Sequence, residues 1–184
     1  QTDRLATFPE VTGMVVQEAG ATRRLFSFGR YGKIDFMIIT HYGREHFKLQ
    51  VGDLTVAVNP VSKDGRGKIS KYGADIVLVT TNHPDYNGAE QTEHGGKTPF
   101  VINGPGEYEV QNIFFKGFST VAKLTEGKKE KEYQNTSYVF MIDGIQITFL
   151  GALSEVLKPE HKEIIDETDV LFIPVGEDGF LLNA

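Results

Sequence analysis

His83 and Asp85 are the residues of this sequence whose types and spacing best suit chemistry, because they follow a largely apolar segment, residues 75–80. A segment of this kind is typical of a buried strand, and polar residues at its end are delivered to the edge of a sheet. An imidazole and a carboxylate can hold a divalent ion, although two ligands alone hold it weakly. A purely structural turn is the alternative, since Asp85 followed by Asn87 and Gly88 also favours a turn.

Other residue types narrow the chemistry further. The chain has no cysteine, which excludes disulfides, thiolate nucleophiles and cysteine-ligated zinc or iron–sulfur sites. It has no Gly-x-Ser-x-Gly sequence, so a serine nucleophile of that kind has no support. Glu107 follows a Gly-Pro-Gly turn and is either an acid beside the site or a surface carboxylate at the start of a strand.

Length and charge limit the class of protein. A chain of 184 residues is long enough for one domain with a sizeable core. The net charge of −6 argues against a general nucleic-acid binder, so no nucleic-acid partner is expected. No apolar stretch approaches the roughly 20 residues that span a bilayer, and residues 1–10 carry no secretory signal. We therefore expect no membrane association, and a cytoplasmic location fits the lack of cysteine.

The elements that must position these residues are mostly strands. Residues 46–51 and 54–58 are predicted to form a hairpin with Gly52-Asp53 as its turn, and Asn59-Pro60 ends its second strand. Asp143-Gly144 gives the strongest hairpin signal of the chain. A mixed-charge run predicts a solvated loop over residues 124–134. The other predictions are a helix over residues 159–168 and strands over residues 11–17, 24–28, 37–40, 75–80, 99–103, 107–110, 113–123, 137–142, 145–150 and 169–175. Two packed sheets with helices outside are the economical arrangement of such elements.

The order of the motifs resembles the metallo-β-lactamase-fold superfamily, in its branch of small, lactonase-like, metal-dependent hydrolases. The motifs are Asn59-Pro60 and the segments 80–86, 104–110, 149–153 and 174–176. The resemblance covers residues 37–184 and leaves residues 1–36 as an N-terminal extension. It implies an α/β fold, an αββα sandwich with two packed mixed sheets and outer helices. We expect this sandwich to be incomplete at the C-terminus, because the family's last elements would fall beyond Ala184.

The resemblance also implies the position of a metal site. The family's His-x-His-x-Asp-His motif falls on Thr81, His83, Asp85 and Tyr86, and its bridging aspartate falls on Ala152. His83 and Asp85 are thus the predicted ligands, and Asp85 is the predicted catalytic residue. Threonine and tyrosine hydroxyls are poor zinc ligands and alanine is none, so the motif is degenerate. Zinc or another divalent transition metal is the implied cofactor, with no metal as the alternative.

The same resemblance implies a cleft for a small-molecule ligand beside these residues. The residues predicted to line it are Thr81, Asn82, Tyr86, Glu107, Ala152 and His46.

Three hypotheses for the function follow. The first is a hydrolase in which metal-activated water attacks an ester, lactone or phosphoester, as the resemblance implies. The second is a catalytically inactive member of the fold that binds a ligand or a protein, since fold alone does not carry function. The third is an interaction protein that uses residues 1–36 for self-association or for binding a partner, since this segment contains the aromatic residues Phe26, Phe28, Tyr31 and Phe36.

Overall fold

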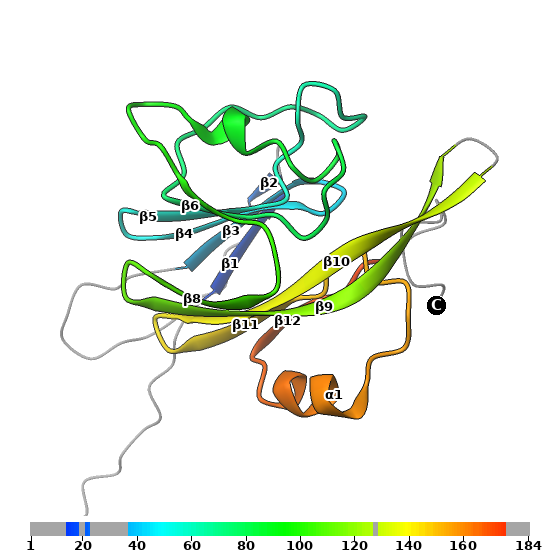
Figure 1. Cartoon of the computed structure of the whole chain (residues 1–184). Coiled ribbons are helices and arrows are strands. Elements are labelled where there is room, and N and C mark those ends of the chain that lie inside the picture. The colour runs from blue at the N-terminus through cyan, green and yellow to red at the C-terminus, as the bar shows by residue number, and fades with distance from the viewer. Residues whose placement is uncertain (1–13, 19–20, 23–36, 127–128, 176–184) are drawn as a thin grey trace, which may run out of the picture.

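Two mixed β-sheets pack face to face in the computed structural model, which describes residues 14–18, 21–22, 37–126 and 129–175 (Figure 1). The first sheet has the strand order β2-β1-β3-β4-β5-β6-β7 and the second β12-β11-β10-β9-β8. The strands of the first sheet are β1 (Met14–Glu18), β2 (Ala21–Thr22), β3 (Met37–Gly43), β4 (His46–Val51), β5 (Leu54–Val58), β6 (Ile76–Leu78) and β7 (Phe100–Ile102). Those of the second are β8 (Gly106–Val110), β9 (Ile113–Glu126), β10 (Lys129–Ile142), β11 (Ile145–Phe149) and β12 (Val170–Phe172).

The main core lies between the two sheets, where apolar side chains alternate along each strand and point inward. The first sheet contributes Ile39, Leu49 and Ile76, and the second contributes Phe115 and Phe149, all of them fully buried. This apolar layer holds the two sheets together and fixes which strand ends come near one another.

The outer faces of the sandwich carry little helix. Helix α1 (Pro159–Asp166) lies on the outer face of the second sheet in Figure 1, where the ring of His161 stacks on that of Phe118 at 4.4 Å. Loops and the short 3-10 helix η1 (Ala89–Thr92) cover the outer face of the first sheet. The two packed mixed sheets, with a helix on one outer face, form the predicted sandwich. No helix in the described ranges is long and apolar enough to cross a membrane.

Both predicted hairpins are confirmed. Strands β4 and β5 pair through Val51 and Leu54 around the predicted turn, and β10 and β11 pair through Ile142 and Ile145. Asp143 and Gly144 have φ values of 52° and 76°, as expected for the two-residue turn that matches the twist of its strands.

The prediction of a loop over residues 124–134 is wrong. Strands β9 and β10 run on to Glu126 and from Lys129, and form a long twisted hairpin that projects from the sandwich (Figure 1). The mixed charges do not break the strands, because opposite charges face each other across the pair. Lys123 and Glu132 are register partners, and Lys123 Nζ lies 3.5 Å from Glu132 Oε1.

The described part of the N-terminal extension adds to the edge of the first sheet. Strand β1 pairs in parallel with β3 and overlaps the strand predicted over residues 11–17. The strand predicted over residues 24–28 and the aromatic cluster lie outside the described residues. Self-association through residues 1–36 therefore stays a prediction.

Candidate functional site

The loop that follows β6 holds the predicted site residues and is fastened to the loop that follows β5. Asn59 has a left-handed φ of 49°, and its Oδ1 accepts a hydrogen bond from the Thr80 amide at 2.8 Å. The amides of Ser62 and Gly88 donate to Pro84 O and Pro60 O, at 2.9 and 2.7 Å. The two loops therefore form one backbone platform, which fixes the positions of residues 81–86.

Asp85 is buried on this platform and is surrounded by arginines. Its Oδ1 accepts the Arg66 amide at 2.5 Å, and its Oδ2 accepts Arg66 Nε at 3.1 Å and Nη2 at 2.9 Å. Arg44 Nη1 lies 3.6 Å from the same Oδ2. Burial alone would raise the pKa of Asp85, but the hydrogen bonds and charge of Arg66 and the charge of Arg44 outweigh it, so the pKa lies below its usual value. Asp85 is therefore a carboxylate at neutral pH, and arginines balance its charge.

His83 is buried beside Asp85 and is held by its ring. The Asp85 amide donates to His83 Nδ1 at 3.2 Å, which leaves Nε2 to carry the proton of the neutral ring. The rings of Tyr86 and Tyr133 meet His83 edge to face, with centroids 6.1 and 5.7 Å away. The imidazole is thus fixed in a largely aromatic setting.

Asn135, in the middle of β10, connects the loop that follows β6 with the loop that follows β11. Its Oδ1 accepts the Thr81 hydroxyl and the Ala152 amide, both at 3.0 Å. Its Nδ2 donates to Thr120 Oγ1 at 2.7 Å and to Leu150 O at 2.8 Å. Every hydrogen-bonding position of this fully buried amide is satisfied. The Thr81 hydroxyl takes part in this network as a donor and therefore has a structural role.

Tyr86 and Ala152, where the sequence resemblance places a histidine and a bridging aspartate, pack in one apolar cluster. Ala122 and Leu124 complete its buried part, and Tyr133 packs against it. Burial, followed by the nearby charges of Glu45 and Asp85, raises the pKa of Tyr86, so the phenol keeps its proton. Apolar side chains thus fill the space between the loop that follows β6 and the loop that follows β11.

Glu45 adds a buried carboxyl group to this region, from the turn between β3 and β4. It is 9% exposed, and burial raises its pKa to about 7. Its charge contributes to the raised pKa of Tyr86. Glu45 is therefore partly protonated at neutral pH, unlike Asp85.

The other predicted cleft residues have different surroundings. His46 Nε2 is 2.8 Å from the Tyr72 hydroxyl, and its ring makes stacked contacts with Tyr42 and Tyr72, with centroids 4.8 and 5.9 Å away. Asn82 is exposed and accepts a hydrogen bond from Asn87. Glu107 is exposed on the edge strand β8, paired in register with Lys116. The structure thus brings together Thr81, His83, Asp85, Tyr86 and Ala152, and gives His46 and Glu107 other partners.

The donors of this region do not fit a dinuclear metal centre. A catalytic zinc takes three protein ligands and an open position for water. Within the described ranges, no three histidine, cysteine, aspartate or glutamate side chains form a group that could hold a metal ion. Both oxygens of Asp85 accept bonds from Arg66, the Thr81 hydroxyl serves Asn135, and the Tyr86 phenol keeps its proton.

Four further residues of this region were not among the predicted site residues: Arg66, Arg44, Glu45 and Asn135. Arg66 lies in a loop rich in glycine and lysine, 19 residues before Asp85, and nothing local marks the pairing. Asn135 sits beside the mixed-charge run that predicted a loop, which hid its place in a strand.

Replacing Arg66 with methionine should destabilise the fold by about 1 to 2 kcal/mol at neutral pH, because a buried carboxylate loses its guanidinium partner while solvent screens part of the loss. The pKa of Asp85 should rise. Because a lowered carboxyl pKa gives stability that is lost as pH falls, the variant should depend less on pH in the acid range. Urea denaturation at several pH values and the carboxyl carbon-13 shift of Asp85 measure both effects. Lys63→Met in the same loop is the matched control, and an equal loss there would contradict the pairing.

Comparisons with known proteins agree with this fold. A family model described as "Beta-lactamase superfamily domain" matches residues 38–184. The chain is similar to the crystal structure of a proposed Zn-dependent hydrolase of the metallo-β-lactamase superfamily from Thermotoga maritima, with 32% identity and a TM-score of 0.57. The match covers 78% of this chain and 63% of the Thermotoga chain, so the present chain spans less than two thirds of that relative. A search of curated proteins finds no match.

Two further solved structures share the fold alone. A proposed metal-dependent hydrolase from Parabacteroides distasonis is 19% identical with a TM-score of 0.55, over 76% of this chain and 70% of that one. CmlA, a diiron β-hydroxylase from Streptomyces venezuelae, is 10% identical with a TM-score of 0.52, over 75% of this chain and 34% of that one. Their descriptions name metal-dependent proteins of different chemistry, so the fold by itself does not select a reaction.

Proposed function

Because the chain belongs to the family of β-lactamase superfamily domains, we propose that it keeps that hydrolase fold with a degraded metal site and acts as a ligand-binding module. The observation that carries the proposal is the pairing of Asp85 with Arg66 and Arg44. A carboxylate whose oxygens already accept charge-assisted hydrogen bonds from guanidinium groups is poorly available to a metal ion. The positive charge that a metal would bring is supplied by the chain.

The packing of Tyr86 against Ala152 supports the same proposal. These residues stand where the family resemblance places a histidine ligand and a bridging aspartate, and both are buried in one apolar cluster. Metal binding there would require displacing apolar side chains, which costs about 1.5–3 kcal/mol for each one exposed to water.

The ligand that suits this surface is a small acidic molecule. The side chains of Arg44 and Arg66 are 37% and 51% exposed while they contact Asp85. Because the exposed part of each guanidinium group presents positive charge at the surface, we expect the ligand to carry an acidic group.

A metal-dependent hydrolase is the second candidate. His83 and Asp85 keep two of the family's ligand positions, and the Thermotoga relative is described as a proposed Zn-dependent hydrolase. The corresponding reaction class is hydrolysis of an ester, lactone or phosphoester, in which a metal ion activates water.

Metal content separates the two candidates. The purified protein, incubated with zinc or manganese and then desalted, should hold well under one equivalent of metal by mass spectrometry, because it offers too few ligands. His83→Ala should give the same value, as should His94→Ala, an exposed loop histidine that serves as the control. One or two equivalents that are lost in His83→Ala alone would overturn the proposal and favour the hydrolase.

A further inference from the structure

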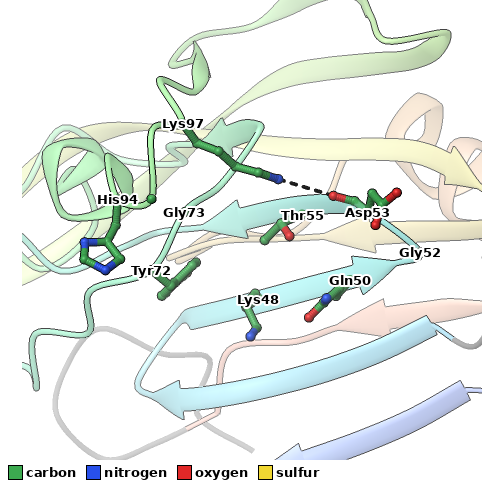
Figure 2. Close-up of a pocket in the computed structure, with 10 residues that line it drawn as sticks. Lys48, Gln50, Gly52, Asp53, Thr55, Tyr72, Gly73, His94 and Lys97 are labelled. Carbon is green, nitrogen blue, oxygen red and sulfur yellow. Dashed lines mark hydrogen bonds between the residues drawn. The ribbon is translucent and has the colours of Figure 1, made fainter.

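A polar pocket on the outer face of the first sheet is separate from the site of His83 and Asp85 (Figure 2). It has a volume of about 360 Å³, within the ~300–1,000 Å³ range of small-molecule sites. Lys48 and Gln50 of β4 and Thr55 of β5 form its floor, and Tyr72, His94 and Lys97 come from the covering loops. It extends to the β4–β5 turn, at the opposite end of β5 and β6 from residues 81–86.

Lys48 brings a positive charge into this pocket that no described carboxylate balances. Its side chain is half-buried, and the loss of water around it lowers the pKa of its ammonium group. The ammonium lies 5.5 Å from the centre of the Tyr72 ring, and the ion pairs of the described residues do not include it. Lys97 differs, because its Nζ is 2.6 Å from Asp75 Oδ2. A partly desolvated cation without a counter-ion favours binding of an anion.

The walls of the pocket are held in place before any ligand arrives. The Tyr72 hydroxyl is hydrogen-bonded to His46 Nε2, and its ring stacks on Tyr42 with centroids 5.4 Å apart. Lys97 Nζ also donates to Asp53 O at 3.2 Å, which fixes the loop over the β4–β5 turn (Figure 2). A preformed site loses less entropy when a ligand binds.

We propose that this pocket binds a small hydroxylated organic anion, whose single carboxylate or phosphate group pairs with Lys48. Gln50 and Thr55 lie beside Lys48 on the floor and can serve its hydroxyl groups. Asp53 lines the far end of the pocket, so a second acidic group there would be repelled. The ligand therefore carries its charge at one end and neutral hydrogen-bonding groups at the other.

The test is an NMR titration of the nitrogen-15-labelled protein with two probes, inorganic phosphate and glycolate. At least one probe should cause saturable shifts of the amides of Gln50, Thr55 and Gly73. Saturation by phosphate alone assigns the pocket to phosphate esters, and saturation by glycolate alone assigns it to hydroxy acids. Shifts confined to the amides of Arg66 and Asp85, or no saturable shift with either probe, would overturn the proposal.

Two variants and one control localise the charge. Lys48→Met keeps the apolar stem and should weaken binding at least about tenfold, because the ligand loses a charge-assisted bond. Gln50→Ala leaves every charge in place and should weaken binding several-fold. Lys116→Met, an exposed lysine of the second sheet, should bind as the parent does. The same spectra report whether each variant is folded, and unchanged affinity in folded Lys48→Met or Gln50→Ala would contradict the proposed contacts.

Discussion

Replacing Asn135 with leucine is expected to lower the free energy of unfolding by about 4 kcal/mol, because it leaves several buried polar groups without hydrogen-bond partners. The Thr81 hydroxyl and the Ala152 amide both donate to Asn135 Oδ1 and lose that acceptor. Each buried group left unsatisfied costs about 1–3 kcal/mol, and Thr120 and Leu150 lose a donor as well. Leucine has a similar size, so the loss reports hydrogen bonds and not a cavity.

Urea denaturation of the parent and the variant measures this loss, with the slope of each curve as a check that the same surface unfolds. Asn82→Leu is the matched control, because that amide is exposed and makes one hydrogen bond to Asn87, so the change should stay within about 0.5 kcal/mol. If Asn135→Leu lowered the free energy of unfolding no more than Asn82→Leu does, Asn135 would not hold together the loops that follow β6 and β11.

Replacing Glu45 with glutamine is expected to stabilise the protein by about 3 kcal/mol at pH 8 and to have little effect at pH 4. Burial raises the pKa of Glu45 from 4.5 to about 7. Between pH 4.5 and pH 7 the folded chain therefore holds a proton that the unfolded chain has lost. Over this window the free energy of unfolding falls as pH rises, by about 1.4 kcal/mol per pH unit. Glutamine has no charge to desolvate and escapes this loss.

Denaturation curves between pH 4 and pH 8 test the effect, and Glu107→Gln is the matched control because its carboxylate faces water on β8. The neighbouring residue sharpens the test. Burial, with the charge of His41, lowers the pKa of His46 to about 4. The stability that comes with the neutral, buried ring is therefore lost as pH falls below 6.5. In the parent, Glu45 makes the free energy of unfolding fall as pH rises, and His46 makes it fall as pH drops, so the two effects partly cancel. Glu45→Gln removes the first effect and should therefore show a steeper loss of stability in acid. A parallel pair of curves for parent and variant would contradict a buried, protonated Glu45.

The fold could be predicted from the sequence where the signals are local. Turn residues at Gly52-Asp53 and Asp143-Gly144 marked both hairpins, and the apolar segment before Thr80 marked the buried strand β6. The same segment led to the loop that holds His83 and Asp85, because a strand end and a polar cluster are adjacent in the chain.

The partners of the site residues could not be predicted, because they are set by tertiary contacts. Asp85 meets Arg66 only because two loops fold over one another, and Asn135 meets Thr81 across 54 residues of chain. No periodicity encodes such a pair. The strand around Asn135 was missed for a related reason, since the opposite charges of Lys123 and Glu132 pair across the strands and are compatible with a two-stranded ribbon.

The pairing of Asp85 with Arg66 also bears on how the protein matures in the cell. Proteins that complete their folding by capturing an ion unfold when a chelator removes it, and their yield follows the supply of that ion. Here the cation that neutralises Asp85 is covalently part of the chain and arrives with its synthesis. The loop that follows β6 therefore needs no external ion to close around Asp85, and EDTA in the growth medium or the buffer should leave the melting temperature unchanged.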